Sequence, residues 1–187
     1  MTADLPSPEL LRKLLRYEPE TGKLFWRERM PDMFRYGKQT ANHNCRRWNS
    51  RFAGTEALTA VDRGGYRHGD IFGRKVKAHR VAYAIYYGTW PENEIDHIDG
   101  VCDNNRIVNL RAATSTDNKR NQKLSSKNTS GVVGVSWHNP TRKWRAYIND
   151  ATGRKYLGLF TAKAEAISAR KVAEIHFGYH ENHGRIE

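Results

Sequence analysis

The chain has 187 residues, a formal net charge of +12 at pH 7 and a pI near 9.9. A strong positive field on a small protein favours polyanionic partners such as nucleic acid. Apolar residues make up 38% of the chain, which is enough for one ordinary domain or two small ones. No run approaches the ~18 apolar residues needed to span a bilayer, so we expect no membrane partner.

The amino terminus lacks the basic-then-apolar pattern of a signal peptide. The two cysteines, Cys45 and Cys102, form no CxxC pair. This excludes a cysteine-based zinc knuckle and argues against a disulfide scaffold. We therefore expect the protein to work in a reducing cytosol.

The first residues predict a short helix followed by a strand. Ser7 suits an N-cap with Pro8 at the first helical position. Four leucines then form one apolar stripe, namely Leu10, Leu11, Leu14 and Leu15. We expect the helix to reach about Tyr17, with a turn over residues 18–22 and a strand over residues 23–26.

Residues 27–51 are basic and show no clear periodicity, which predicts an irregular segment. Arginines and lysines are interleaved there with Phe34, Tyr36 and Trp48. Such a mixture can clamp phosphates and stack on bases. A solvated loop with inward-facing aromatic rings explains it equally well, so both interpretations stay open.

Residues 54–77 alternate glycine-rich turns with short β-prone pieces, which predicts a small meander. Residues 78–87 then place apolar side chains at helical spacing and meet Gly88, a natural C-terminal cap. His79 lies on this predicted helix. A lone helix histidine is more often structural than catalytic, so it is left outside the predicted active site.

Residues 94–122 predict a ββα unit, on which the rest of the chain depends. A strand is expected over residues 95–98, a turn-rich loop over residues 99–105 and a returning strand over residues 106–111. A short helix is expected to begin near Ser115 or Thr116.

The polar residues of this unit suit phosphodiester hydrolysis with one metal ion. A Mg²⁺-like ion can neutralise charge at phosphorus and stabilise the leaving oxygen, and it prefers oxygen ligands. Asp96 offers a carboxylate and Asn118 an amide oxygen. The imidazole of His97 is suited to taking a proton from water near neutral pH. A regular strand would point Asp96 and His97 to opposite faces, so a local twist or bulge is expected.

Simpler explanations exist for the same residues. Asp-Gly and Asp-Asn-Asn are common turn formers, so residues 99–105 taken alone could be only a loop. An EF-hand is excluded because glycine and the terminal glutamate do not fall at the required offsets.

The complete spacing resembles the HNH endonuclease family, and more narrowly its phage and homing-type branch. Asn109 lies twelve positions after His97, and Asn118 nine positions further on. The resemblance implies that Asp96 is the first metal ligand, His97 the general base, Asn109 a structural residue and Asn118 the last ligand. Much of the family has histidine at the last position, so this is an H-N-N site.

An amide in place of an imidazole favours hard cations. The resemblance therefore implies one Mg²⁺ or Mn²⁺ ion and no small-molecule cofactor. Arg111 and Arg120 are expected to contact phosphates, although either could be a surface charge.

The composition changes after Gln122. Residues 123–130 are short, polar and basic, which is typical of a linker. Three strands are expected over residues 132–137, 143–149 and 155–160, followed by a helix over residues 162–177. We expect the inward face of this helix to carry Ala166, Ala169, Ala173 and Phe177.

This βββα order resembles the AP2 DNA-binding domain, whose sheet lies in the major groove. Period-two alternation puts Arg145, Tyr147 and Asn149 on one face and Trp144, Ala146 and Ile148 on the other. The predicted DNA-binding residues of this unit also include members of the flanking strands, namely Lys143, Arg154 and Tyr156, with Ser136 and His138 as further candidates. The alternative is a basic sheet that binds only phosphates.

The sequence thus predicts an α+β protein with a ββα-metal nuclease core. Residues 1–122 would form the endonuclease domain, residues 123–130 a linker and residues 131–187 an AP2-like domain. We expect a monomeric, homing-like endonuclease that cuts or nicks double-stranded DNA in the cytoplasm of a cell hosting a phage or mobile element. The alternatives are a DNA-binding regulator with an inactive nuclease core and an RNA-binding protein.

Overall fold

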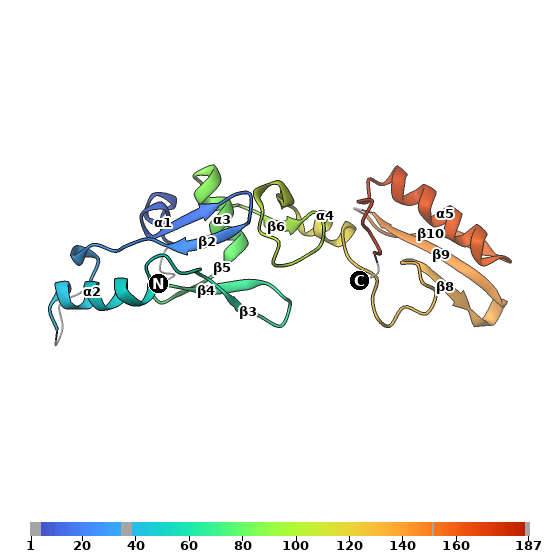
Figure 1. The fold of residues 1–187 in the computed structure, drawn as a ribbon. Helices are drawn as coiled ribbons and strands as arrows, with labels where there is room; N and C mark the ends of the chain where they lie inside the picture. The colour runs from blue at the N-terminus through green and yellow to red at the C-terminus, as the bar shows by residue number, and fades with distance from the viewer. Residues whose placement is uncertain (1–4, 35–38, 151, 186–187) are drawn as a thin grey trace. The chain divides into compact units, whose positions relative to one another are not determined.

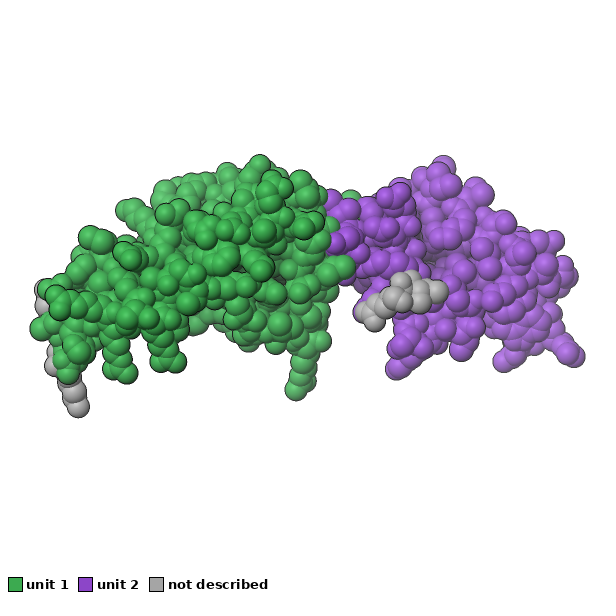
Figure 2. Space-filling view, in the orientation of Figure 1, with its two compact units in different colours: residues 1–97, 101–112 green, residues 98–100, 113–187 purple. Residues whose placement is uncertain are grey.

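The computed structural model describes residues 5–34, 39–150 and 152–185. The chain divides into two compact units (Figure 2). The first comprises Met1–His97 and Val101–Ala112, and the second comprises Ile98–Gly100 and Ala113–Glu187. The mixture of helices and sheets confirms the predicted α+β class. Within the described ranges, no helix is both long and apolar enough to cross a membrane.

The first unit combines three helices with short antiparallel sheets (Figure 1). In chain order its elements are α1 (Pro8–Leu14), β1 (Leu15–Glu18), β2 (Lys23–Trp26), the 3₁₀ turn η1 (Pro31–Met33), α2 (Ala41–Phe52), β3 (Ala60–Val61), β4 (Arg67–Ile71), β5 (Arg74–Lys77), α3 (Ala78–Tyr87), β6 (Glu94–His97), the 3₁₀ turn η2 (Ile107–Asn109) and β7 (Leu110–Ala113).

Helix α1 begins as predicted, with the Ser7 hydroxyl accepting the Leu10 N–H at 3.2 Å. Leu11 and Leu14 are completely buried in the main core of the unit. The predicted extension of this helix to Tyr17 is wrong, because residues 15–18 form β1 and pair antiparallel with β2. The backbone hydrogen bonds between β1 and β2 replace those that a longer helix would have formed.

Helix α2 lies in the stretch predicted to be irregular, so that prediction is wrong for residues 41–51. Thr40 caps the helix by accepting the His43 N–H on its hydroxyl. Three asparagines in the helix lower its intrinsic propensity and obscured the signal. An apolar face at helical spacing is nevertheless present, consisting of Ala41, Cys45, Trp48 and Phe52. Tyr36, predicted in the same stretch, lies outside the described residues.

The predicted meander is confirmed as the antiparallel sheet β3-β4-β5. Helix α3 follows directly and ends at Gly88, whose φ of 78° provides the expected left-handed cap. Val81, Ala82 and Ala84 of α3 are fully buried, and α3 packs on α1 and β4.

The central segment departs from its predicted strands in one place. Strand β6 pairs with β7, but residues 107–109 form a 3₁₀ turn instead of the start of the returning strand. The reason is a set of contacts with the amino-terminal hairpin: the Ile107 N–H donates to Pro19 O at 3.2 Å, and the Tyr17 hydroxyl donates to Asn105 O at 2.7 Å. These bonds draw the loop onto the hairpin and delay the strand until Leu110.

The second unit is a three-stranded sheet covered on one face by a helix (Figure 1). Its elements are α4 (Ser115–Arg120), β8 (Val135–His138), the 3₁₀ turn η3 (Asn139–Thr141), β9 (Lys143–Asp150), β10 (Gly153–Phe160) and α5 (Lys163–His176). The sheet order is β10-β9-β8, and α5 packs on all three strands. Helix α4 begins where predicted, and Thr114 and Asp117 form a capping box.

The core of the second unit lies between sheet and helix. Val135, Ala146 and Ala166 form its centre. Of the four α5 residues predicted to face inward, Ala166 and Ala173 are buried, while Ala169 and Phe177 are half-buried. Residues 123–130 contain no helix or strand, yet they are tied into the unit by a bond from the Leu124 N–H to Arg185 O at 3.0 Å. The domain boundary at this segment stays a prediction.

Gly22 provides a test of how the hairpin holds the loop. Its φ is +74°, and a Cβ there would lie 2.5 Å from both Arg106 N and Asn105 C. We expect Gly22→Ala to lower the free energy of unfolding by about 2 kcal/mol or more, measured by urea denaturation. Gly54→Ala is the matched control, because Gly54 has φ +77° and no described heavy atom within 4 Å of the place where a Cβ would lie. Equal losses in the two variants would contradict a steric role for the close approach.

Candidate functional site

His97 lies at the end of β6 and is 4% exposed. Its Nε2 is 3.0 Å from Oδ1 of Asn105, a residue that is itself 2% exposed. An amide oxygen only accepts hydrogen bonds, so in this contact Nε2 of His97 is the donor when it carries a proton. From the sequence, Asn105 is predicted only as part of a turn. Three consecutive polar residues, Asp103 to Asn105, gave no signal that distinguished the buried one.

Asp96 is also buried, and its carboxylate pairs with the neighbouring strand. Arg111 on β7 donates from Nε and Nη2 to Oδ2 of Asp96, at 2.9 and 2.7 Å. Arg111 therefore orients and neutralises this carboxylate. Its predicted contact with a phosphate stays a prediction.

Asn109 closes the loop that carries Asn105. Its side-chain amide donates to Asn104 O at 2.8 Å, and its backbone N–H donates to Arg106 O at 2.9 Å. The residue is 7% exposed. Asn109 thus lies within the first unit together with Asp96 and His97.

Asn118 belongs to the second unit, on α4. Its backbone N–H donates to Thr114 O at 3.0 Å, and its carbonyl accepts the Asn121 N–H at 3.1 Å. These bonds fix the residue in the helix. Its role as a metal ligand beside Asp96 stays a prediction.

Two further rings enclose His97. His79 lies edge-on to it, with ring centroids 5.2 Å apart, and Tyr66 lies 5.7 Å from it. Burial, followed by the charge of His97, lowers the pKa of His79 to about 3, so His79 is neutral at physiological pH. Burial likewise raises the pKa of Tyr66 to about 12. His79 was left outside the predicted site, and its position beside His97 depends on tertiary packing that helical spacing does not reveal.

The donor chemistry fits a hard cation better than zinc. Over the described ranges, no three His, Cys, Asp or Glu side chains cluster as a cation site. Cys45 and Cys102 are not joined in a disulfide. A site based on the Asp96 carboxylate would be completed by amide, water or phosphate oxygens, which are the ligands of Mg²⁺ or Mn²⁺.

The sheet of the second unit alternates as predicted. Ala146 and Ile148 are completely buried, whereas Arg145, Tyr147 and Asn149 lie on the opposite face. Residues that lie directly opposite each other on neighbouring strands share a face of the sheet. Three such pairs extend the face opposite α5, namely Arg145 with Ser136, Tyr147 with Tyr156 and Asn149 with Arg154. Lys143 pairs with His138 at the edge of the same face. DNA contact by these side chains stays a prediction.

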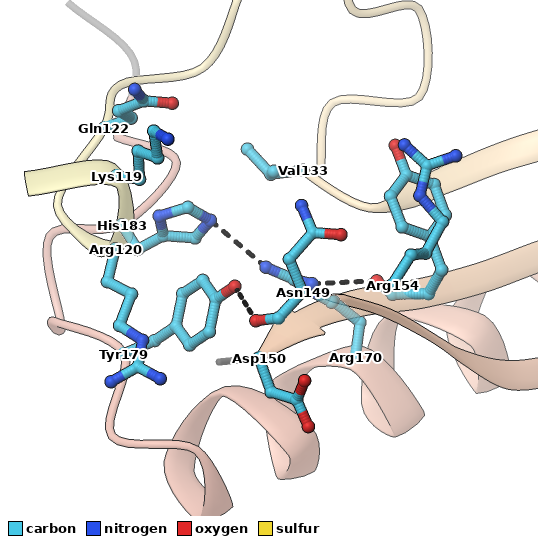
Figure 3. A pocket seen from close by; sticks show the side chains of 11 residues that line it. Lys119, Arg120, Gln122, Val133, Asn149, Asp150, Arg154, Arg170, Tyr179 and His183 are labelled. Carbon is cyan, nitrogen blue, oxygen red and sulfur yellow. Dashed lines mark hydrogen bonds between the residues drawn. The ribbon is translucent and has the colours of Figure 1, made fainter. Parts of the chain in front are cut away.

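A basic pocket of about 410 Å³ adjoins this face (Figure 3). Its lining includes four cationic residues, namely Lys119, Arg120, Arg154 and Arg170. The one acid in the lining, Asp150, forms a salt bridge with Lys155 at 2.6 Å, which holds the pKa of Asp150 well below its usual range. Because Glu174 neutralises Arg170, the positive charge of the pocket comes from Lys119, Arg120 and Arg154.

Arg170 is the structural centre of the pocket and was missed in the sequence analysis. It is 2% exposed, pairs with Glu174 at 2.9 Å and donates to Tyr147 O at 2.8 Å. Figure 3 shows its guanidinium between His183 and β9. The i,i+4 spacing of Arg170 and Glu174 was the available signal, but such pairs are more often exposed.

Comparison with known proteins identifies one segment. Residues 76–120 match the sequence model of a family described as HNH endonuclease. This confirms the HNH part of the predicted resemblance, and the AP2-like part stays a prediction. Protein 3.8 of Escherichia phage T7 is 40% identical over 62 residues, which are 33% of this chain and 50% of the phage protein. The chain thus spans about half the length of this curated relative.

A solved structure titled "DNA binding and cleavage by the HNH homing endonuclease I-HmuI" has a TM-score of 0.37 and 17% sequence identity. The match covers 91% of the present chain and 89% of the chain in the solved structure. A likeness at this level carries no argument about activity.

The neutral state of His79 predicts a pH dependence of stability. Because its folded pKa of about 3 lies below the unfolded value of 6.5, its contribution is complete above pH 6.5 and declines as the pH falls toward 3. Between pH 7.5 and pH 5 we expect the wild type to lose about 2 kcal/mol through this group. His79→Gln should remove most of that loss in urea titrations at the two pH values. His176→Gln, at an exposed histidine of α5, should leave it unchanged.

Proposed function

We propose that the chain is a metal-dependent DNA endonuclease of HNH type, with His97 as the general base. The observation that carries this proposal is the buried hydrogen bond between His97 and Asn105, within a segment that matches the HNH family. Asn105 would hold the His97 ring through Nε2 and so orient the imidazole that takes a proton from the attacking water.

Asp96 and Asn118 would hold one Mg²⁺ or Mn²⁺ ion. The ion, when bound, would neutralise charge on the scissile phosphate and on the leaving oxygen. Arg111 fixes the orientation of the Asp96 carboxylate through two hydrogen bonds to Oδ2, and the ion would share this carboxylate with Arg111. Asn109 would act structurally, by closing the loop that presents Asn105 to His97.

The second unit would hold the DNA as an AP2-like sheet. Its support is the arrangement of polar and aromatic side chains on the face opposite α5, together with the adjoining basic pocket. Tyr156 is 60% exposed there, and the guanidinium of Arg154 lies 4.4 Å over the Tyr147 ring. Arg120 lines the pocket and would contact a backbone phosphate. A homing-like role in a phage-infected cell, with the protein acting as a monomer, is part of the same proposal.

A plasmid assay tests the nuclease. Supercoiled DNA should become nicked or linear with Mg²⁺, and EDTA should abolish the reaction. His97→Ala should lower the cleavage rate by roughly 100-fold or more, because a general base contributes about that factor. Asn118→Ala should also lose activity, and part of it should return at higher Mg²⁺ if this residue is a ligand.

His176→Ala is the matched control, since this exposed histidine of α5 lies outside the proposed site. Duplex binding measured for each variant shows that it is folded. Binding without cleavage by the wild type would replace the nuclease with a DNA-binding regulator.

The sheet is tested by the salt dependence of duplex binding. Lys143→Ala and Arg154→Ala should each weaken binding and reduce the slope of log K against log salt by about 1, as loss of a phosphate contact does. Lys163→Ala, an exposed lysine on α5, should leave the slope unchanged. Preference for single-stranded RNA over duplex DNA in a competition gel would reject the AP2-like proposal.

A further inference from the structure

A second pocket, of about 380 Å³, lies in the first unit and is lined mainly by aromatic rings. Its lining residues come from β2, the segment after it, α2 and the β4–β5 hairpin, and they are Trp26, Arg29, Trp48, Phe52, Asp70 and Phe72. None of them belongs to the proposed nuclease site.

The aromatic walls are built by one turn of α2 facing β2. Trp48 and Phe52 are four residues apart on the helix, with ring centroids 5.3 Å apart. Trp26 meets Trp48 edge-on at 5.6 Å. Phe72 completes the lining from the hairpin tip, where it is 50% exposed. Its φ of 53°, followed by 78° at Gly73, is the geometry of the two-residue turn that joins β4 to β5.

Arg29 forms the polar part of the pocket, and its backbone is held rigidly. Asn49 on α2 accepts the Arg29 N–H and donates to the Arg29 carbonyl, both at 2.9 Å. The guanidinium lies 3.9 Å over the Trp48 ring and within 5.3 Å of the rings of Trp26 and Phe72. Among the described residues it forms no ion pair, and its shielded Nε has no hydrogen-bond partner. Desolvation accordingly lowers the pKa of Arg29.

The surroundings of the pocket are cationic. Helix α2 contains no acid, and its three arginines, Arg46, Arg47 and Arg51, are all exposed. The lining contains one carboxylate, Asp70, which is exposed and accepts the Gly73 N–H on Oδ1 at 2.7 Å.

We propose that this pocket receives an unstacked nucleobase of a DNA strand. Flat rings provide a stacking surface for any base. Arg29 can donate to a ring nitrogen or carbonyl, and Asp70 can accept from an exocyclic amine, so together they match a base edge. The exposed arginines of α2 would neutralise the phosphates on either side. An apolar side chain or acyl chain would leave the Arg29 guanidinium without a hydrogen-bond acceptor. The proposal rests on DNA being the ligand of the proposed nuclease.

The test measures the binding of the full-length protein, in EDTA, to two single-stranded DNA 12-mers of equal charge. One has a mixed base sequence and the other is abasic. The wild type should prefer the base-bearing strand, and Phe72→Asn should reduce that preference roughly tenfold by removing a stacking surface. Asparagine tolerates positive φ, so this change adds no backbone strain. Trp48→Leu should act in the same direction. Affinity for the abasic strand should stay unchanged in both variants.

Tyr86→Ala is the matched control, because Tyr86 on α3 is also 50% exposed. If Phe72→Asn melts normally and keeps the wild-type preference for the base-bearing strand, the proposal is overturned. This outcome does not depend on whether Trp48→Leu folds. Plasmid cleavage by the same proteins separates the two proposals. Cleavage without a Phe72-dependent preference rejects only the base pocket, whereas a Phe72-dependent preference without cleavage rejects only the nuclease.

Discussion

Burial of polar side chains at the end of β6 is the constraint on which the first unit depends. Four of them are less than 10% exposed, namely Asp96, His97, Asn105 and Asn109. A buried polar group without a partner costs free energy, so each must be matched by a neighbour. His97 is hydrogen-bonded to Asn105, and Asp96 accepts hydrogen bonds from Arg111. The side-chain amide of Asn109 donates to the carbonyl of Asn104. Any shift of the loop would break several of these bonds together, which makes the position of the His97 ring insensitive to local fluctuation.

The amino-terminal hairpin supports this loop from behind. Tyr17 on β1 donates to the backbone of Asn105, and Pro19 accepts the Ile107 N–H. Gly22 allows the turn to approach residues 105–106 without a side chain between them. Burial raises the pKa of Tyr17 well above its usual range, so its hydroxyl remains a donor at any physiological pH. The opening residues of the chain thus contribute to the candidate site without carrying any of its chemistry.

The sequence predicted local features well where one short-range signal determined them. The start of α1, the end of α3 at Gly88 and the alternation along β9 followed from a cap, a glycine and a period of two. Helix α2 was missed because its asparagines weakened the propensity signal. The role of His79 could not be predicted, since it depends on the packing of α3 against the end of β6. Asn105 could not be distinguished by sequence from the other polar residues of its loop.

The distribution of charge explains how a chain with so many cations can fold compactly and still present free positive surface. Buried or half-buried acids have local partners: Asp96 pairs with Arg111, and Glu174 pairs with Arg170. The Arg170–Glu174 pair is shielded and responds weakly to salt, whereas exposed charges are screened within about 8 Å at physiological ionic strength. The surplus therefore lies where acids are absent, on α2 and on the exposed face of the second sheet. Added salt should consequently weaken association with a polyanion more than it weakens the fold, because the hydrophobic cores and the buried Arg170–Glu174 pair are screened much less than exposed charges.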